Sequence, residues 1–132
     1  MKKHEIMETN YYYLLYDPKQ KHVAEIKPGT SQQSYLSSRI SRIHADEPNM
    51  KLIGFLTVYN THKARIEAIE HDIKADLVDA GFDHYGNDHF KIKFDRKGKR
   101  KDQYNLIANA ILLKAMYYCE EQHLKYNVTW VG

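Results

Sequence analysis

Short runs of apolar and aromatic residues alternate with polar turns along the first part of the chain. Residues 11–16 (YYYLLY) are too few for a typical helix and are followed at once by Asp17-Pro18, which predicts a buried strand. After a polar turn, residues 23–26 (VAEI) predict a weaker strand that pairs with the first as a hairpin. Lys27-Pro28-Gly29 then indicates that this second strand ends in a turn.

The spacing of apolar residues next becomes helical. Thr30 and Gln33 are placed as a capping box, which predicts a helix over residues 31–44. Arg39 lies between the apolar positions of this segment when they are drawn on a helical wheel, so a permanently charged side chain is expected on the inward edge of the stripe. The apolar positions are Leu36, Ile40 and Ile43.

A third strand and a second helix follow. Residues 52–59 (LIGFLTVY) form a short apolar run rich in β-forming residues, which predicts a buried central strand. Asn60 or Thr61 can cap the next helix, which should end near Gly81. Glu70 falls on the edge of the buried stripe of that helix. The stripe consists of Ile66, Ile69, Ile73 and Leu77.

The last third of the chain adds one strand, a long helix and a closing segment. Residues 81–87 have the composition of a loop, and residues 89–94 (HFKIKF) alternate with period two, as a half-buried strand does. Asp102 can cap a helix that runs to about residue 123. Residues 128–131 are consistent with a closing strand. The order of elements predicts a single α/β domain over residues 1–132.

Composition supports one globular domain and places its positive charge unevenly. The chain is 42% hydrophobic and 28% charged, a balance that is typical of folded proteins and not of disordered segments. The net charge of +3 is too small to indicate a polyanionic partner by itself, so the local distribution matters more. The densest positive cluster surrounds Gly98 and consists of Arg96, Lys97, Lys99, Arg100 and Lys101.

Cysteine content and hydropathy predict a cytoplasmic protein. The single cysteine, Cys119, cannot form an intramolecular disulfide. The polar N-terminal residues contain no apolar signal-peptide core, and the longest apolar stretch, residues 106–116, is interrupted by Asn109 and Lys114. We therefore expect neither secretion nor a membrane-spanning segment.

Two segments resemble motifs of the GIY-YIG nuclease superfamily, particularly its compact branch found in phage proteins. Residues 10–15 (NYYYLL) are similar to the first-strand motif, with Tyr13 at the position of its tyrosine. Residues 26–30 (IKPGT) resemble the second motif but lack the tyrosine expected there. The resemblance covers about residues 11–94 and implies a small mixed sheet flanked by helices, with residues 95–132 as an added C-terminal helical extension.

The helical segments carry the rest of the resemblance. Ser38-Arg39-Ile40 resembles the segment with the catalytic arginine, and His44 lies near the place where many members carry a histidine. Ile69-Glu70 resembles the segment with the metal-binding glutamate. An alternative register uses Glu67 and His71, but it fits the apolar spacing less well. Residues 86–90 (GNDHF) are similar to a frequent ending of the branch.

The resemblance implies a cytoplasmic, phage-type endonuclease that hydrolyses DNA with Mg²⁺ or Mn²⁺. Arg39 would hold the scissile phosphate, because a guanidinium can donate two parallel hydrogen bonds to it. Glu70 would bind the metal, because a carboxylate suits a hard cation. Tyr13, helped by His44, would handle the attacking water, although the missing second tyrosine weakens the case for a general base.

Two further surfaces have candidate partners. The basic cluster at residues 96–101 is expected to contact the DNA backbone without reading its sequence. The segment 106–119 predicts a core helix, and because its apolar residues cover more than one helical stripe, the C-terminal helix can also form the interface of a homodimer. The alternatives to an enzyme are a nuclease-derived module that binds nucleic acid without turnover, and a small adaptor that binds only protein.

Overall fold

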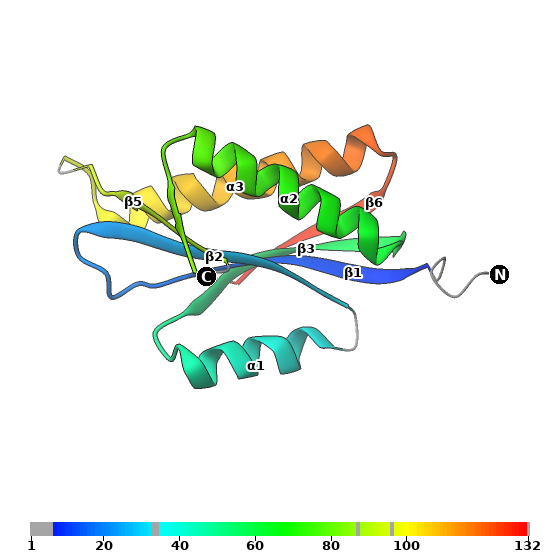
Figure 1. The fold of residues 1–132 in the computed structure, drawn as a ribbon, viewed down its shortest axis with the longest axis horizontal. Coiled ribbons are helices and arrows are strands. Elements are labelled where there is room, and N and C mark those ends of the chain that lie inside the picture. The colour runs from blue at the N-terminus through cyan, green and yellow to red at the C-terminus, as the bar shows by residue number, and fades with distance from the viewer. Residues whose placement is uncertain (1–6, 33–34, 87, 96, 132) are drawn as a thin grey trace.

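A computed structural model describes residues 7–32, 35–86, 88–95 and 97–131. It has three layers: a six-stranded sheet carries helix α1 on one face and helices α2 and α3 on the other (Figure 1). The strand order is β4-β5-β2-β1-β3-β6, and the pairings between described strands are all antiparallel. The α/β prediction is confirmed, but the sheet is antiparallel and not mixed.

Strands β1 (Glu8–Tyr16) and β3 (Lys51–Thr61) form the centre of the sheet, as their apolar runs predict. Side chains of a strand alternate between the two faces. Tyr12 and Leu14 accordingly pack in the core under α2 and α3, whereas Tyr13 and Leu15 pack against α1.

Strand β2 (Val23–Gln32) is much longer than predicted, and it passes straight through Pro28-Gly29, where the sequence indicates a turn. It pairs with β1 along residues 26–32, whereas β5 pairs with it only from Val23 to Ile26. Beyond Ile26 one side of β2 is therefore a sheet edge, and proline is tolerated in edge strands. The predicted capping box is wrong, because Thr30 lies in this strand; Gln33 lies outside the described residues.

Three shorter strands complete the sheet. The predicted loop at residues 81–87 contains β4 (Asp83–Tyr85), which pairs with β5 (His89–Lys93) after a turn at Gly86, where φ is 60°. Its polar composition hid an edge strand whose side chains are all exposed. The predicted closing strand is confirmed as β6 (Lys125–Trp130), which pairs with β3.

The helices are α1 (Leu36–Asp46), α2 (Lys63–Asp79) and α3 (Arg100–Glu121). The predicted caps of α2 and α3 are wrong. Thr61 is a buried strand residue and His62 takes the N-cap position of α2, while Lys99 takes that of α3, so Asp102 lies inside the first turn. A cap is predicted from only a few neighbouring residues. The cap expected at Asn60 or Thr61 does not form because strand β3 extends through both residues.

One large core unites the sheet with α2 and α3. The predicted stripe of α2 is confirmed, since Ile66, Ile69, Ile73 and Leu77 are all buried. Helix α3 contributes residues to the same cluster, and Cys119 among them is completely buried. The C-terminal segment is thus integral to the fold and not an appendage. Among the described residues, no helix has the length and apolar character needed to cross a membrane.

Candidate functional site

A cleft of about 330 Å³ lies at the open edge of β2, beyond the point where β5 stops pairing. The end of β2, the start of α1 and the start of α2 come together there, at the right of Figure 1. Polar side chains dominate the described lining: Asn10, Tyr13, Gly29, Thr30, Ser31, Gln32, Tyr35, Ser38, Arg39, Arg42, Lys63, Ile66, Glu67, Glu70 and Asp88.

Helix α1 supplies a basic wall. Its apolar positions pack toward the sheet, and a different set of positions, separated by three, one and three residues, lines the cleft. This spacing places side chains one above another on a single helical face. The set comprises Tyr35 at the N-cap, Ser38, Arg39 and Arg42. The exposed guanidinium groups of this face can reach a bound anion.

Helix α2 supplies an acidic wall from the other face of the sheet. Its cleft residues follow the same helical spacing: Lys63, Ile66, Glu67 and Glu70. Lys63 pairs with Glu67, with 3.5 Å between Nζ and Oε1, and both side chains are largely exposed. An exposed pair of this kind is weak and can be broken by a ligand. Glu70 lies deeper and is half-buried.

Tyr13 reaches the cleft by lying across Gly29. The two residues are directly opposite in the pairing of β1 with β2. A Cβ atom placed on Gly29 would come within 2.3 Å of Tyr13 Oη and 2.4 Å of Cζ. Only glycine therefore leaves room for the tyrosine ring at this point of β2. The ring is 4% exposed and has the cleft on one side.

Burial sets the protonation of both central groups. It raises the pKa of Glu70, with Asp88 and Glu67 adding to the effect, while Lys74 and Arg39 act against it. Burial also raises the pKa of Tyr13 to about 12, although the positive charge of Arg39 lowers it. The cleft thus holds a carboxylate whose charge is poorly compensated and a phenol that stays protonated at neutral pH.

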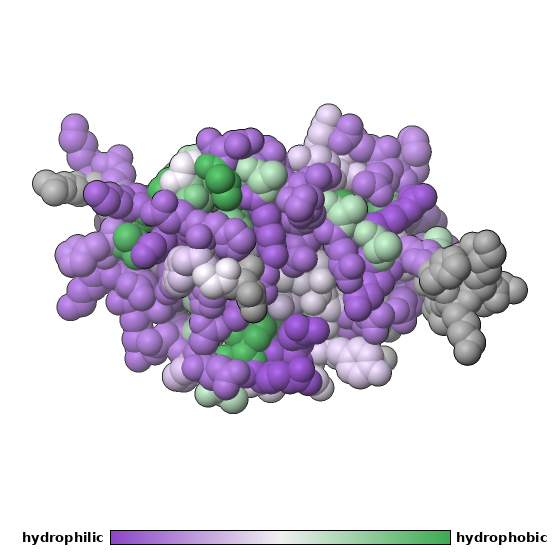
Figure 2. Space-filling model, in the orientation of Figure 1, coloured by the Kyte–Doolittle hydropathy of each residue, from purple (hydrophilic) through white to green (hydrophobic). Residues whose placement is uncertain are grey.

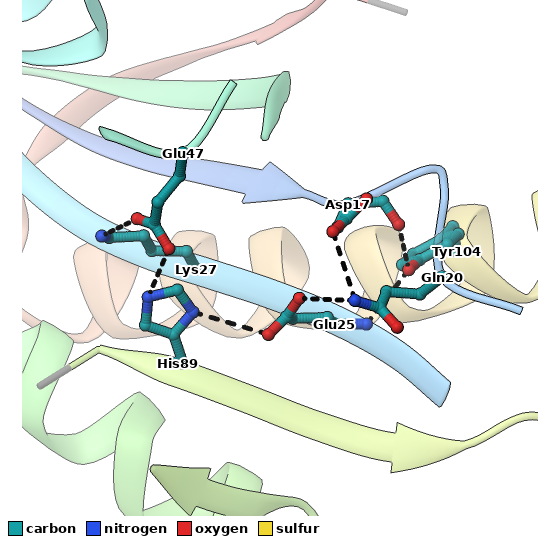
Figure 3. A network of polar contacts seen from close by, with 7 residues as sticks. All are labelled: Asp17, Gln20, Glu25, Lys27, Glu47, His89 and Tyr104. Atoms are coloured by element: carbon teal, nitrogen blue, oxygen red, sulfur yellow. Dashed lines mark hydrogen bonds and ion pairs between the residues drawn. The ribbon is translucent and has the colours of Figure 1, made fainter. Parts of the chain in front are cut away.

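A polar network ties the C-terminal end of α1 to strands β2 and β5 (Figure 3). Glu47, which follows α1, accepts a hydrogen bond from Lys27 Nζ at 2.6 Å and lies 2.8 Å from His89 Nε2. Nδ1 of the same histidine is 3.7 Å from Glu25. Lys27 precedes the cleft segment of β2, and His89 follows Asp88, whose Oδ1 is 2.6 Å from Lys74 Nζ. These contacts join the C-terminal end of α1 to β2 and β5, and other residues next to them in β2 and before β5 line the cleft.

The structure brings three of the four predicted catalytic residues together. Tyr13, Arg39 and Glu70 line one cleft although they lie on a strand and two different helices. Glu67, the alternative to Glu70, lines it too, so the two registers are not exclusive. His44 is exposed on α1 and is not among the described lining residues, because it follows Ile43, which faces the sheet.

The described part of the predicted basic cluster, residues 97–101, lies at the opposite end of the sheet, at the left of Figure 1. Arg100 donates a hydrogen bond of 2.7 Å to the carbonyl of Gln20 in the β1–β2 hairpin. The lysines of the cluster are exposed, and Arg96 lies outside the described residues. From Val23, near this end, to Gly29 at the cleft, β2 advances roughly 20 Å at about 3.3 Å per residue. The cluster is therefore remote from the cleft.

Sequence reasoning missed several residues of the cleft. Arg42 had a usable signal, because it follows Arg39 by three residues and so shares its helical face. Asp88 had a weaker one, since it belongs to the segment of residues 86–90 that resembles a family motif; Asn87 of that segment lies outside the described residues. Tyr35 gave no signal, because its position depends on where α1 begins.

The acidic wall suits a metal ion that is bound partly by the protein and partly by the substrate. No group of three or more His, Cys, Asp or Glu side chains within the described ranges is placed to hold a metal ion. Mg²⁺, however, usually binds one or two carboxylates and completes its shell with waters and substrate phosphates. Glu70 and Asp88 line the same cleft and interact electrostatically. The donor set fits a shared protein–substrate site.

Comparisons with known proteins add no relative. No protein-family model matches the sequence, and neither a curated protein nor a solved structure matches it. Function is therefore inferred from the residues of the cleft and from the motif resemblance.

Proposed function

We propose that the protein is a metal-dependent endonuclease that hydrolyses phosphodiester bonds of DNA. The observation that carries this proposal is one cleft with Arg39 and Arg42 on one wall and Glu70 and Asp88 on the other. Phosphodiester hydrolysis needs cationic donors for the phosphate oxygens and carboxylates that can hold a divalent cation. The GIY-YIG resemblance supports the same assignment.

The arginines bind and orient the phosphate. A guanidinium is planar and always charged, and it can donate two parallel hydrogen bonds to one phosphate. The positive charge of Arg39 acts to lower the pKa of both Glu70 and Tyr13. We assign Arg39 to the scissile phosphate and Arg42, one turn further along α1, to an adjacent one.

Glu70 and Asp88 would hold Mg²⁺ or Mn²⁺. When bound, the cation supplies Lewis-acid polarisation of the phosphate and offsets charge on the leaving oxygen. The raised pKa of Glu70 reflects a carboxylate whose charge is poorly solvated where it lies. A cation beside it would relieve that cost. Lys74 forms an ion pair with Asp88 and so keeps the Asp88 carboxylate oriented when no cation is bound.

Tyr13 acts as a hydrogen-bond donor in this proposal. A phenol with a pKa of about 12 is protonated at neutral pH, so it cannot readily accept a proton from water. Its hydroxyl group can instead donate to a phosphate oxygen held by Arg39. This replaces the role in water activation that the motif resemblance implies for Tyr13, and His44 has no place in the described lining.

The alternative is a nuclease-derived module that binds DNA without cleaving it. Two observations favour it: the protonated state of Tyr13, and the lack of three protein ligands for a metal within the described ranges. Such a module would still use the basic wall of the cleft and the remote basic cluster.

Plasmid nicking separates the two functions. We expect the protein to nick supercoiled plasmid with Mg²⁺ or Mn²⁺ and to stop when EDTA is added. Glu70→Gln should abolish nicking but keep DNA binding, because the amide retains the shape of the side chain and loses its charge. Asp79→Asn, at the exposed end of the same helix, is the matched control and should cleave normally. Metal-independent binding without nicking on any DNA form would overturn the enzyme and leave the binding module.

A further inference from the structure

Helix α3 has an apolar stripe on the side that faces away from the core. Its buried residues all lie on one face: Tyr104, Ala108, Ile111, Leu112, Ala115 and Cys119. The exposed stripe follows the spacing four, three, four and lies on the opposite side of the helix at 3.6 residues per turn. It consists of Leu106, Ala110, Leu113 and Tyr117. The three large members are 69%, 60% and 59% exposed.

This spacing is that of a helix–helix seam. Apolar positions alternating by three and four residues let two helices pack side by side along their length. Three large apolar side chains on one exposed line exceed the scattered exposure usual on a monomer. Ala110 is small, so it allows a second helix to approach closely at the middle of the stripe.

An apolar groove of about 250 Å³ lies next to the stripe, between α2 and α3. Leu106 belongs to both features, since it lines the groove and heads the stripe. Hydrophobic residues also show at the surface over the C-terminal half of α2, at the upper left of Figure 2. The groove is lined mainly by apolar side chains from both helices and their flanks: Ile73, Leu77, Phe82, Leu106, Ile107 and Ile111.

We propose that a second copy of this chain packs its α3 antiparallel against the stripe, about a two-fold axis between Ala110 and Leu113. In that register Leu106 lies opposite the partner's Tyr117, beside the groove, and Ala110 lies opposite the partner's Leu113. The stripe is self-complementary because a large residue meets a large one at the ends and a small one meets a large one at the centre. An isologous contact of this kind closes as a dimer.

Charge selects the antiparallel arrangement. The chain around the start of α3 carries Lys97, Lys99, Arg100 and Lys101 against one acid, Asp102, and the helix ends in Glu120-Glu121. Antiparallel packing places the basic end of each helix beside the acidic end of the other and opposes the two helix dipoles. Parallel packing would bring like charges together at both ends.

The oligomeric state tests this proposal, which does not depend on nuclease activity. By equilibrium sedimentation, we expect the wild-type mass to rise with concentration from 15.6 kDa toward twice that value. Leu113→Glu should keep the protein monomeric at every concentration, and at concentrations where the wild type is also monomeric the two should melt at the same temperature, because the side chain is exposed. Val131→Glu changes an exposed apolar residue outside the stripe and should dimerise as the wild type does. A wild type that stays monomeric would overturn the proposal.

A mixture of two variants tests the register. Leu113→Glu and Ala110→Lys should each be monomeric alone, because each puts two unpaired charges at the centre of the interface. Mixed, they should form a heterodimer, since one glutamate then meets one lysine and the other Ala110–Leu113 contact is native. Mixed variants that stay monomeric, while the wild type dimerises, would overturn the antiparallel register.

Discussion

At the scale of single residues, the charge of Glu70 costs the folded protein stability. Burial raises the pKa of this carboxyl above its ordinary value, so the folded state holds the proton more tightly than the unfolded chain does. The cost therefore appears as pH rises through the ordinary pKa to the folded one, and it persists at neutral pH. Glu70→Gln should raise the melting temperature by a few degrees at neutral pH and leave it unchanged at acidic pH.

Thermal melts in a series of buffers measure this difference. Mg²⁺ provides a second arm, because a ligand that binds only the folded state stabilises it. It should raise the melting temperature of the wild type but not that of Glu70→Gln. A variant that melts lower than the wild type at neutral pH would mean that the carboxylate at position 70 is well compensated, contrary to its assignment as a metal ligand.

Arg39 should matter to cleavage and hardly at all to folding. Its side chain is exposed, so Arg39→Ala removes no core packing. Loss of one donor to a phosphate in the transition state typically slows a reaction by about 10²–10³-fold. Arg39→Lys should recover only part of the rate, because an ammonium group cannot form the paired hydrogen bonds. Single-turnover nicking rates measure the effect of both variants, and Arg65→Ala, at an exposed position of α2, is the control. If all three variants cleave at the wild-type rate, Arg39 is not part of the site.

Gly29 should be intolerant of any side chain while Tyr13 is present. A methyl group would overlap the phenol ring, and overpacking of this kind usually costs about 1–3 kcal/mol. Tyr13→Leu shortens the opposing side chain and should remove most of the additional cost of Gly29→Ala. A double-mutant cycle from urea unfolding gives this coupling energy. Additive effects would show that the strand, and not the ring, demands glycine.

The important charged residues could be predicted because they interrupt periodic patterns. Arg39 and Glu70 lie at the edges of apolar stripes, and both line the cleft. The course of the chain through Gly29 could not be predicted, since Pro28-Gly29 is also typical of a turn, and only pairing with β1 decides between turn and strand. The composition of residues 27–30 does not indicate which other strand will pair with this segment.

At the scale of elements, long periodic segments were predictable and their ends were not. The stripe of α2 and the central strand β3 are confirmed because each is defined by many residues. Helix α1 begins five residues later than the capping box indicates, since β2 extends to Gln32. Strand β4 escaped prediction because a short edge strand with exposed side chains has no apolar pattern.

The basic cluster combines an exposed set of lysines with one arginine that has a structural contact. Changing Lys97, Lys99 and Lys101 to Ala should weaken binding to all DNA sequences equally, and each lost phosphate contact should reduce the log-log salt slope by about 0.9. Titrations at several salt concentrations measure the slope. A slope equal to that of the wild type would show that these lysines are merely solvated.

Arg100 needs separate treatment because it donates to the carbonyl of Gln20 and so ties the start of α3 to the β1–β2 hairpin. Adding Arg100→Ala to the three lysine changes should lower the melting temperature, whereas the lysine changes alone should not. Differential scanning calorimetry of the two variants separates the structural contribution from the electrostatic one.

At the scale of the whole molecule, the cleft and the basic cluster occupy opposite ends of the sheet (Figure 1). Their separation along β2 of roughly 20 Å corresponds to about six base pairs of DNA. Affinity should therefore increase steeply once a duplex is long enough to reach both ends, and this increase should vanish in the triple lysine variant. Fluorescence anisotropy with duplexes of graded length measures it. A length dependence that is the same in both proteins would show that the two ends do not share one DNA molecule.

The sole cysteine of the chain can be used to measure how often the structure around it opens. Cys119 is fully buried where α3 packs on the sheet, and burial raises its pKa to about 11. A thiol that is both shielded and protonated reacts with alkylating reagents only when the surrounding structure opens. The rate of alkylation at low reagent concentration therefore equals the opening equilibrium multiplied by the rate for a free thiol. The alkylation rate therefore reports the equilibrium for local opening around α3 without any engineered label.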